Sequence, residues 1–171
     1  YFRIAQTYEA RRDAASAEKN YRATVKAAAG LQAGSDPMEY AGHAAFILTE
    51  QQFGDIERMK ITGGGKALLA SMQSFEKRVA DAVAEYNKVL EYKRATWTLA
   101  AYFRTGYLFE VYSKALLNAP CPPEVKKLGV EACDLYRNQI EQKVSDVEEE
   151  AVKRYGVTLD QAGKLGVVNE W

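Results

Sequence analysis

The chain has 171 residues, 47% of them hydrophobic, so it can form one domain with a substantial buried core. Its 23 Lys and Arg residues balance 23 Asp and Glu residues. Zero net charge argues against a nucleic-acid-binding surface, which needs an excess of basic residues, and against binding to an anionic membrane surface. No apolar run approaches the ~20 residues that span a bilayer, so we expect no direct membrane insertion.

Helix-forming residues fill the segments between a few clear breaks, and no stretch alternates apolar and polar residues long enough to predict a strand. The first two helices are predicted over residues 1–10 and 14–29. A tight turn joins them, in which the Asp13 side chain can cap the second helix. The segment 30–34, with a glycine at each end, then ends that helix. We therefore expect an all-α protein.

The sequence Ser-Asp-Pro at 35–37 predicts the start of the next helix, because a capping side chain followed by proline is typical of a first turn. This helix extends to Phe53 and can continue to Met59, before three glycines at 63–65 break the chain. A long helix is predicted over 66–92. Its apolar residues recur in alternating steps of three and four: Leu69, Met72, Phe75, Val79, Ala82, Tyr86 and Val89.

That spacing is typical of a coiled-coil seam and also of a stripe that faces the core of its own chain. The seam contains a small residue, Ala82, and apolar positions flank it, such as Leu68, Val83 and Leu90. These flanking residues widen the stripe, so we favour the core-facing interpretation over a dimeric zipper.

Thr96 is predicted to cap a helix over 97–118, which ends before the prolines of 120–123. We then expect one long helix from Glu124 to Tyr155, a break at Gly156 and a short helix from Thr158 to about Gly166.

The two cysteines lie in different settings within this arrangement. Cys121 falls in the proline-rich break, whereas Cys133 falls well inside the predicted helix, which rises ~1.5 Å per residue. Their Cα atoms are then expected to lie farther apart than the ~7 Å that a disulfide tolerates. Both cysteines are therefore predicted to be free thiols.

The sequence also contains an internal repeat. YFRIAQTYE at 1–9 matches YFRTGYLFE at 102–110, with Tyr, Phe, Arg and Glu at the same places. A small residue recurs as Ala5 and Gly106. A weaker copy begins at residue 46, although the bulky Glu50 occupies its small position.

The repeat resembles the tetratricopeptide (TPR) motif, in which a small residue lets two helices approach and aromatic residues fill the gap between helix pairs. Six of eight signature positions match: Tyr1, Ile4, Ala5, Tyr8, Ala17 and Tyr21. Thr24 replaces a later alanine, and Ala29 stands where a proline is expected.

The resemblance implies antiparallel helical hairpins stacked as a TPR-like solenoid. The copies begin at residues 1, 46 and 102, so their spacings of 45 and 56 exceed the family's period of about 34 and imply unusually long helices. We expect one domain over 1–171: an orthodox unit at 1–30, a long helical pair at 37–92 and divergent repeat helices at 96–166.

Four further stretches resemble TPR-containing cell-envelope proteins of deltaproteobacteria, including proteins associated with gliding motility. They are A-x2-A-A-F-x-L-x-E at 41–50, W-x2-A-A-Y at 97–102, N-A-P-x-P-P at 118–123 and N-E-W at 169–171. This resemblance implies a scaffold in the bacterial periplasm or cell envelope. Because the chain begins without methionine, we expect it to be a fragment of a longer protein.

No catalytic, cofactor-binding or metal-binding residue is predicted. The single histidine, His43, lies among alanines on a helix, where a core or groove histidine is expected. The acids at 148–150 point in different directions on a helix and indicate a solvated face. The sequence Gly-Gly-Gly-Lys at 63–66 lacks the preceding strand and following Ser or Thr of a phosphate loop, so we interpret it as a hinge.

In TPR arrays, the residue after the first aromatic and those four, seven and eight beyond it line the concave groove. The resemblance therefore implies these groove residues: Phe2, Gln6, Glu9 and Ala10 in the first copy, and Phe103, Tyr107, Glu110 and Val111 in the third. They are not the lysines and asparagines with which TPR chaperone adaptors bind a C-terminal carboxylate. We expect a peptide with apolar anchors and basic flanks. Alternatively, the aromatic residues pack against the long helices.

The leading hypothesis is a non-catalytic protein–protein interaction scaffold within a multiprotein assembly, whose partners are other proteins or peptides. The alternative is a structural self-assembly segment, in which the 69–89 seam joins copies into dimers or filaments.

Overall fold

The computed structural model describes residues 1–167, 169 and 171, so the predicted motif at 169–171 lies partly outside the described residues. Within the described part, seven α-helices pack as antiparallel neighbours and no sheet occurs. The helices are α1 (Phe2–Ala10), α2 (Ala14–Ala27), α3 (Asp36–Phe53), α4 (Gly65–Val89), α5 (Ala95–Leu117), α6 (Pro123–Lys126) and α7 (Val130–Leu165). Two 3-10 turns are η1 (Ile56–Arg58) and η2 (Leu90–Tyr92). The predicted all-α class is confirmed.

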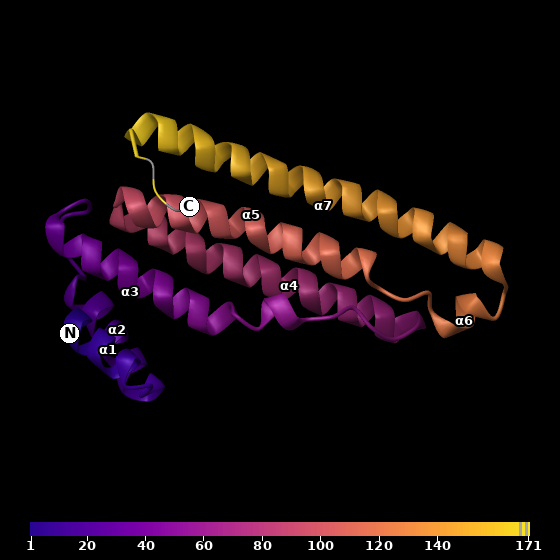
Figure 1. Ribbon diagram of the computed structural model, residues 1–171, viewed down its shortest axis with the longest axis horizontal. Helices are drawn as coiled ribbons and strands as arrows, with labels where there is room; N and C mark the ends of the chain where they lie inside the picture. Colours follow the sequence, from indigo (N-terminus) through magenta and orange to yellow (C-terminus); the bar gives the residue numbers. More distant parts are fainter. Residues whose placement is uncertain (168, 170) are drawn as a thin grey trace.

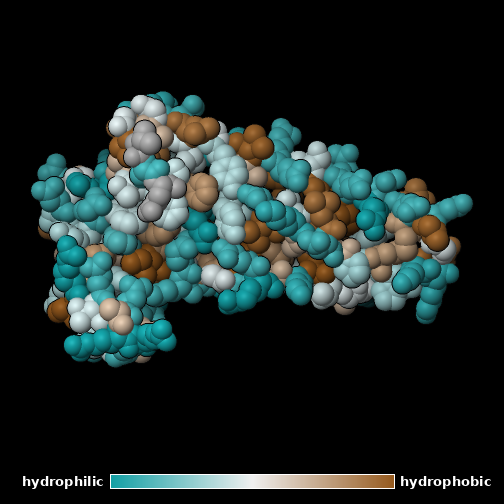
Figure 2. Space-filling model, viewed as in Figure 1, coloured by the Kyte–Doolittle hydropathy of each residue, from teal (hydrophilic) through white to brown (hydrophobic). Residues whose placement is uncertain are grey.

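The molecule is elongated, and α3, α4, α5 and α7 run roughly along its long axis (Figure 1). The short α1–α2 pair packs against α3 near one end, and α6 lies near the other end. From α1 to α5, each helix packs against the next one in the chain. The short α6 contacts α7, and the most extensive interface is between α5 and α7. The face seen in Figure 2 is mainly hydrophilic, with apolar side chains in separate patches.

The first two helices form as their sequence predicts. The Asp13 carboxylate accepts a hydrogen bond from the backbone N–H of Ser16 at 3.1 Å and so caps α2. Ala5 and Ala17 are fully buried in one cluster with Phe2 and Tyr21. The small residues therefore lie at the interface between the helices, as the repeat pattern predicts.

The seam on α4 faces the core of its own chain. Its buried members are Phe75, Val79, Ala82, Tyr86 and Val89, which are at most 3% exposed. Of the other two, Met72 is half-buried and Leu69 is 59% exposed. The core-facing interpretation is confirmed, and the five buried side chains are not available to a second copy.

The helix predicted from Glu124 to Tyr155 is wrong at its start. The chain forms the single turn of α6, reverses at Leu128 and Gly129, and only then begins α7 at Val130. Gly129 has φ of 108°, a conformation that residues with a Cβ rarely adopt. The glycine therefore separates two helices that the prediction joined.

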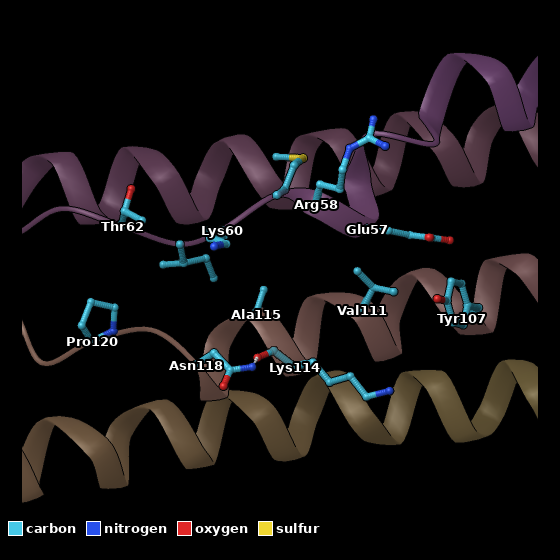
Figure 3. Close-up of a pocket in the computed structure, with 12 residues that line it drawn as sticks. Glu57, Arg58, Lys60, Thr62, Tyr107, Val111, Lys114, Ala115, Asn118 and Pro120 are labelled. Atoms are coloured by element: carbon cyan, nitrogen blue, oxygen red, sulfur yellow. Dashed lines mark hydrogen bonds between the residues drawn. The ribbon is translucent and has the colours of Figure 1, made fainter.

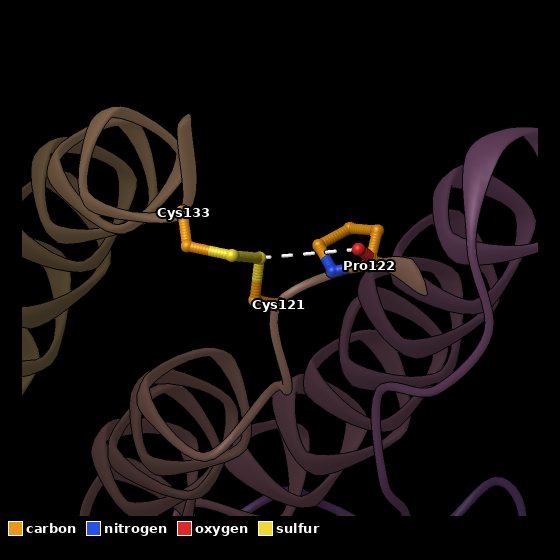
Figure 4. Close-up of a disulfide and its surroundings, with 3 residues drawn as sticks. All are labelled: Cys121, Pro122 and Cys133. Atoms are coloured by element: carbon orange, nitrogen blue, oxygen red, sulfur yellow. Dashed lines mark hydrogen bonds between the residues drawn. A yellow bond between two sulfur atoms is a disulfide. The ribbon is translucent and has the colours of Figure 1, made fainter. Parts of the chain in front are cut away.

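This reversal brings the two cysteines together, so the prediction of free thiols is also wrong. Cys133 lies in the first turn of α7, and its Cα is 5.8 Å from that of Cys121. The two sulfur atoms form a disulfide that joins the loop after α5 to the start of α7 (Figure 4). Neither cysteine is free.

Two smaller predictions are wrong as well. The helix α7 continues through Gly156 to Leu165 instead of breaking, and Thr158 donates a hydrogen bond to the carbonyl of Arg154 from inside the helix. Packing against α5 offsets the cost of about 1 kcal/mol for a helical glycine. At the start of α5, Arg94 takes the capping position, and Thr96 lies inside the helix.

We predict that the disulfide stabilises the fold by reducing the number of conformations open to the unfolded chain. Closing a loop of 12 residues is expected to contribute about 3 kcal/mol to the free energy of unfolding. The measurement is urea denaturation of the oxidised protein and of the Cys121→Ser/Cys133→Ser variant. Thiol titration of the denatured, non-reduced protein should count zero, and a count of two would contradict the bridge.

A second prediction concerns the close approach of α5 and α7 at Gly106. A Cβ at this position would lie 2.9 Å from two ring carbons of Tyr155, so Gly106→Ala should cost about 1–3 kcal/mol of stability by overpacking. Gly156→Ala is the matched control, because a Cβ there meets nothing within 4 Å and alanine favours a helix. In chemical denaturation, the free energy of unfolding should fall for Gly106→Ala and rise for Gly156→Ala. Equal changes in the two variants would contradict the close contact between Gly106 and Tyr155.

Candidate functional site

Among the groove residues implied by the first copy, Phe2 is buried, Gln6 is half-buried, and Glu9 and Ala10 are exposed. Phe2 is 7% exposed, and its ring centroid lies 5.7 Å from that of Tyr21. Glu9 accepts a hydrogen bond from the Tyr21 hydroxyl at 2.7 Å. Gln6 accepts one from Arg3 at 3.1 Å on the exposed surface of α1. In this copy the aromatic residue is part of the core.

The other copy repeats the same contacts with a different helix. Phe103 lies 5.6 Å from the ring of Tyr155 on α7, and Glu110 accepts a hydrogen bond from the Tyr155 hydroxyl at 2.8 Å. These are the repeat positions of Phe2 and Glu9. Hairpins α1–α2 and α5–α7 are therefore built on the same phenylalanine–tyrosine–glutamate contact, and α7 covers Phe103.

Tyrosine–glutamate hydrogen bonds also join the other neighbouring long helices. Tyr112 on α5 donates to Glu76 on α4 at 2.8 Å. Tyr86 on α4 donates to Glu50 on α3. Burial and the neighbouring carboxylate both raise the pKa of each of these tyrosines. Only the tertiary structure reveals these pairs, because their members lie 36 residues apart.

Glu50, the bulky residue in the small position of the weak copy, is an interhelical acceptor. The Arg104 guanidinium on α5 donates to its two carboxylate oxygens at 2.6 and 2.7 Å. The same guanidinium lies 4.8 Å from the centroid of the Tyr107 ring and 3.4 Å from a carboxylate oxygen of Glu57. Arg104 thus links α3 to Tyr107, a predicted aromatic residue that faces an opening.

That opening is a groove of about 640 Å³ between α5 and the segment 57–62. It is lined by Glu57, Arg58, Met59, Lys60, Ile61, Thr62, Tyr107, Val111, Lys114, Ala115, Asn118 and Pro120. In Figure 3, Val111 and Ala115 point from α5 toward the 57–62 segment, and Tyr107 lies at one end. Of the predicted site residues, the structure brings only Tyr107 into this groove, together with the implied Val111.

The local sequence explains why the second wall stands apart from α5. Ile56 and Ile61 are buried and anchor the segment in the core. The Ser71 hydroxyl on α4 donates to the carbonyl of Lys60 at 3.4 Å and accepts from the N–H of Thr62 at 3.2 Å. These bonds hold the segment against α4, so a space remains between it and α5. The glycines at 63–65 connect this segment to the start of α4. From the sequence they were predicted to be a hinge, and nothing in their pattern indicated a neighbouring groove.

The charge of the groove differs from the charge expected from the implied residues. Neither Glu9 nor Glu110 lines the groove. Each accepts a hydrogen bond from a tyrosine, and Glu110 also pairs with Lys114; the bonds from Lys114 and Tyr155 lower the pKa of the Glu110 carboxyl. Arg58 and Lys60 form no ion pair within the part of the chain that the structure describes. The basic residues therefore predominate around the groove.

Among the described residues, no group of three or more His, Cys, Asp and Glu side chains is arranged to hold a metal ion. His43 stacks on Trp97 with ring centroids 3.8 Å apart, and burial lowers its pKa. Within the same residues, no helix combines the length and apolar character needed to cross a membrane.

No family model, curated protein or solved structure matches this chain. The resemblance to TPR proteins is thus carried by the motif residues, and its functional implications belong to the proposal below.

We predict that the interhelical tyrosine hydroxyls stabilise the fold. Tyr112→Phe removes a hydrogen bond to the ionised Glu76 and should lower the free energy of unfolding by about 1–3 kcal/mol. The matched control is Tyr136→Phe, because the Tyr136 hydroxyl is buried without a partner among the described residues. Its loss should leave stability unchanged or raise it. Equal destabilisation of both variants in urea denaturation would contradict a role for the hydrogen bond.

Proposed function

We propose that this chain is a non-catalytic protein-interaction scaffold, and that the groove between α5 and the segment 57–62 holds a segment of a partner protein. The observation that carries the proposal is a large open groove with an apolar floor, built on a long packed helix. Sites that bind partner segments commonly combine apolar pockets with a polar rim. Tyr107, at one end of the groove, belongs to a residue type that often dominates binding energy.

The TPR-like pattern supports this proposal. The two best copies form hairpins with the same internal contacts, with buried small residues at Ala5 and Gly106. Stacked hairpins of this kind present extended surfaces to other proteins. A TPR-like solenoid extended by long helices is therefore the architecture we propose.

We also propose a location in the bacterial periplasm or cell envelope, as part of a multiprotein assembly. The Cys121–Cys133 disulfide supports this location, because such bonds persist in oxidising compartments. The alternative role, self-assembly through the 69–89 seam, has less support. Five of its seven apolar side chains are buried within the chain, and Leu69 alone is strongly exposed.

The proposed function is tested by photo-crosslinking. A benzoylphenylalanine at position 107 should crosslink a partner in an extract of the native cells, and the same group at the exposed Leu135 on α7 should not. The captured protein is then purified and titrated against the chain by calorimetry. Val111→Glu places a charge on the groove floor and should weaken binding about tenfold or more.

Leu135→Glu is the matched control, since it adds the same charge to an apolar position outside the groove. It should leave the dissociation constant within about twofold. Both variants must keep the wild-type melting temperature. Binding that is unaffected by Val111→Glu in a folded protein would contradict the groove as the interaction site.

A further inference from the structure

The length of the groove limits what it can hold. Tyr107 and Asn118 lie 11 positions apart on α5, which corresponds to about 16 Å along the helix axis. An extended peptide rises about 3.3 Å per residue, so about five residues fill this length. The groove therefore suits a short segment rather than a large folded surface.

The floor of the groove selects for apolar side chains. Met59 contributes from one wall and Val111 and Ala115 from the other, and all three are partly buried at the edge of the main core. Covering these side chains would remove apolar surface from water, which favours binding by about 25 cal/mol per Å². One or two apolar anchor residues of the occupant are thereby favoured.

The mouth of the groove selects for negative charge. Three basic residues, Arg58, Lys60 and Lys114, surround it, against one acid, Glu57. Glu57 lies 3.4 Å from the Arg104 guanidinium, which already binds both carboxylate oxygens of Glu50, so the charge of Glu57 is offset only in part and basic residues still outnumber acids in the groove lining. Among the residues that the structure describes, Lys114 pairs only with Glu110, in an exposed contact between neighbouring turns that contributes little to stability.

The two remaining cations stand at different places along the wall. Figure 3 shows Lys60 and Arg58 on the segment opposite α5, and the Arg58 guanidinium is directed away from α5. Neither forms an ion pair with a described residue. Both are exposed, so each can meet a carboxylate without losing an existing ion pair to a described residue. Positive potential at the mouth also steers acidic partners toward the groove.

We infer that the occupant of this groove is an acidic peptide segment with one or two apolar anchors. The inference rests on the proposed function and names its partner chemistry: the anchors contact the floor, and the acidic residues lie along the 57–62 wall, which carries Arg58 and Lys60. It replaces the basic flanks expected from Glu9 and Glu110, because neither of these residues lines the groove.

The experiment is a selection from a random dodecapeptide library displayed on phage, against the purified oxidised chain. Wild type should enrich peptides with net negative charge and apolar residues. The Arg58→Glu/Lys60→Glu variant should lose this acidic bias and bind the most enriched wild-type peptide at least about tenfold more weakly. The control is Lys19→Glu/Lys26→Glu, which makes the same change in net charge at two exposed positions of α2 and should retain the bias.

The outcomes separate the partner class from the site. Suppose that the enriched peptides share apolar anchors and lose binding to Val111→Glu, but that wild type and the Arg58→Glu/Lys60→Glu variant enrich peptides of the same net charge. This result would overturn the inference of an acidic partner, and the groove would still be the binding site. Enriched peptides that bind Val111→Glu as well as wild type would overturn the proposed function itself, provided that the variant melts like wild type.

Discussion

The paired hydrogen bonds between Arg104 and Glu50 connect the core of this protein to its groove. Glu50 receives both of these bonds and the Tyr86 hydroxyl, so α3, α4 and α5 meet at one carboxylate. The guanidinium is largely buried and also contacts Glu57 and the face of Tyr107. Because a buried charge without its partner is costly, these contacts hold η1 and α5 at a fixed separation. The width of the groove depends on that separation.

The repeat explains which side chains are structural and which face solvent. In both good copies, the phenylalanine and the closing glutamate contact a tyrosine of the helix that packs against the copy, Tyr21 on α2 in one case and Tyr155 on α7 in the other. The repeated residues therefore specify how two helices pair. The residues that line the groove are not the ones that make this phenylalanine–tyrosine–glutamate contact. They lie at other positions of α5 and on the irregular segment 57–62, which is outside the copies. Similarity between the copies thus identifies the scaffold more directly than the binding surface.

The disulfide fixes the far end of the molecule, where α5 and α7 are joined by a proline-rich loop and the short α6. Pro120, which lines the groove, stands next to Cys121 in this loop. The disulfide therefore has two effects: it reduces the conformational freedom of the unfolded chain, and it restrains the end of the groove wall at Pro120. The α5–α7 hairpin is thereby held at two places, by Tyr155 with Glu110 and by the bridge.

The sequence by itself determined the all-α class, the order of the first five helices, the Asp13 cap and the buried face of α4, because periodicity and capping act over a few neighbouring residues. The repeat also predicted Tyr107 and Val111 as groove residues; both line the groove, and their binding role stays a prediction. Tertiary structure alone decided the disulfide, the continuity of α7 through Gly156 and the groove. Each depends on how segments distant in sequence approach each other: the turn at Gly129 brings the cysteines together, and packing on α5 overrides the helix-breaking tendency of a glycine. The basic character of the groove was likewise hidden, because it depends on the folding that places Arg58 and Lys60 opposite Lys114 and leaves Glu9 and Glu110 outside the groove lining.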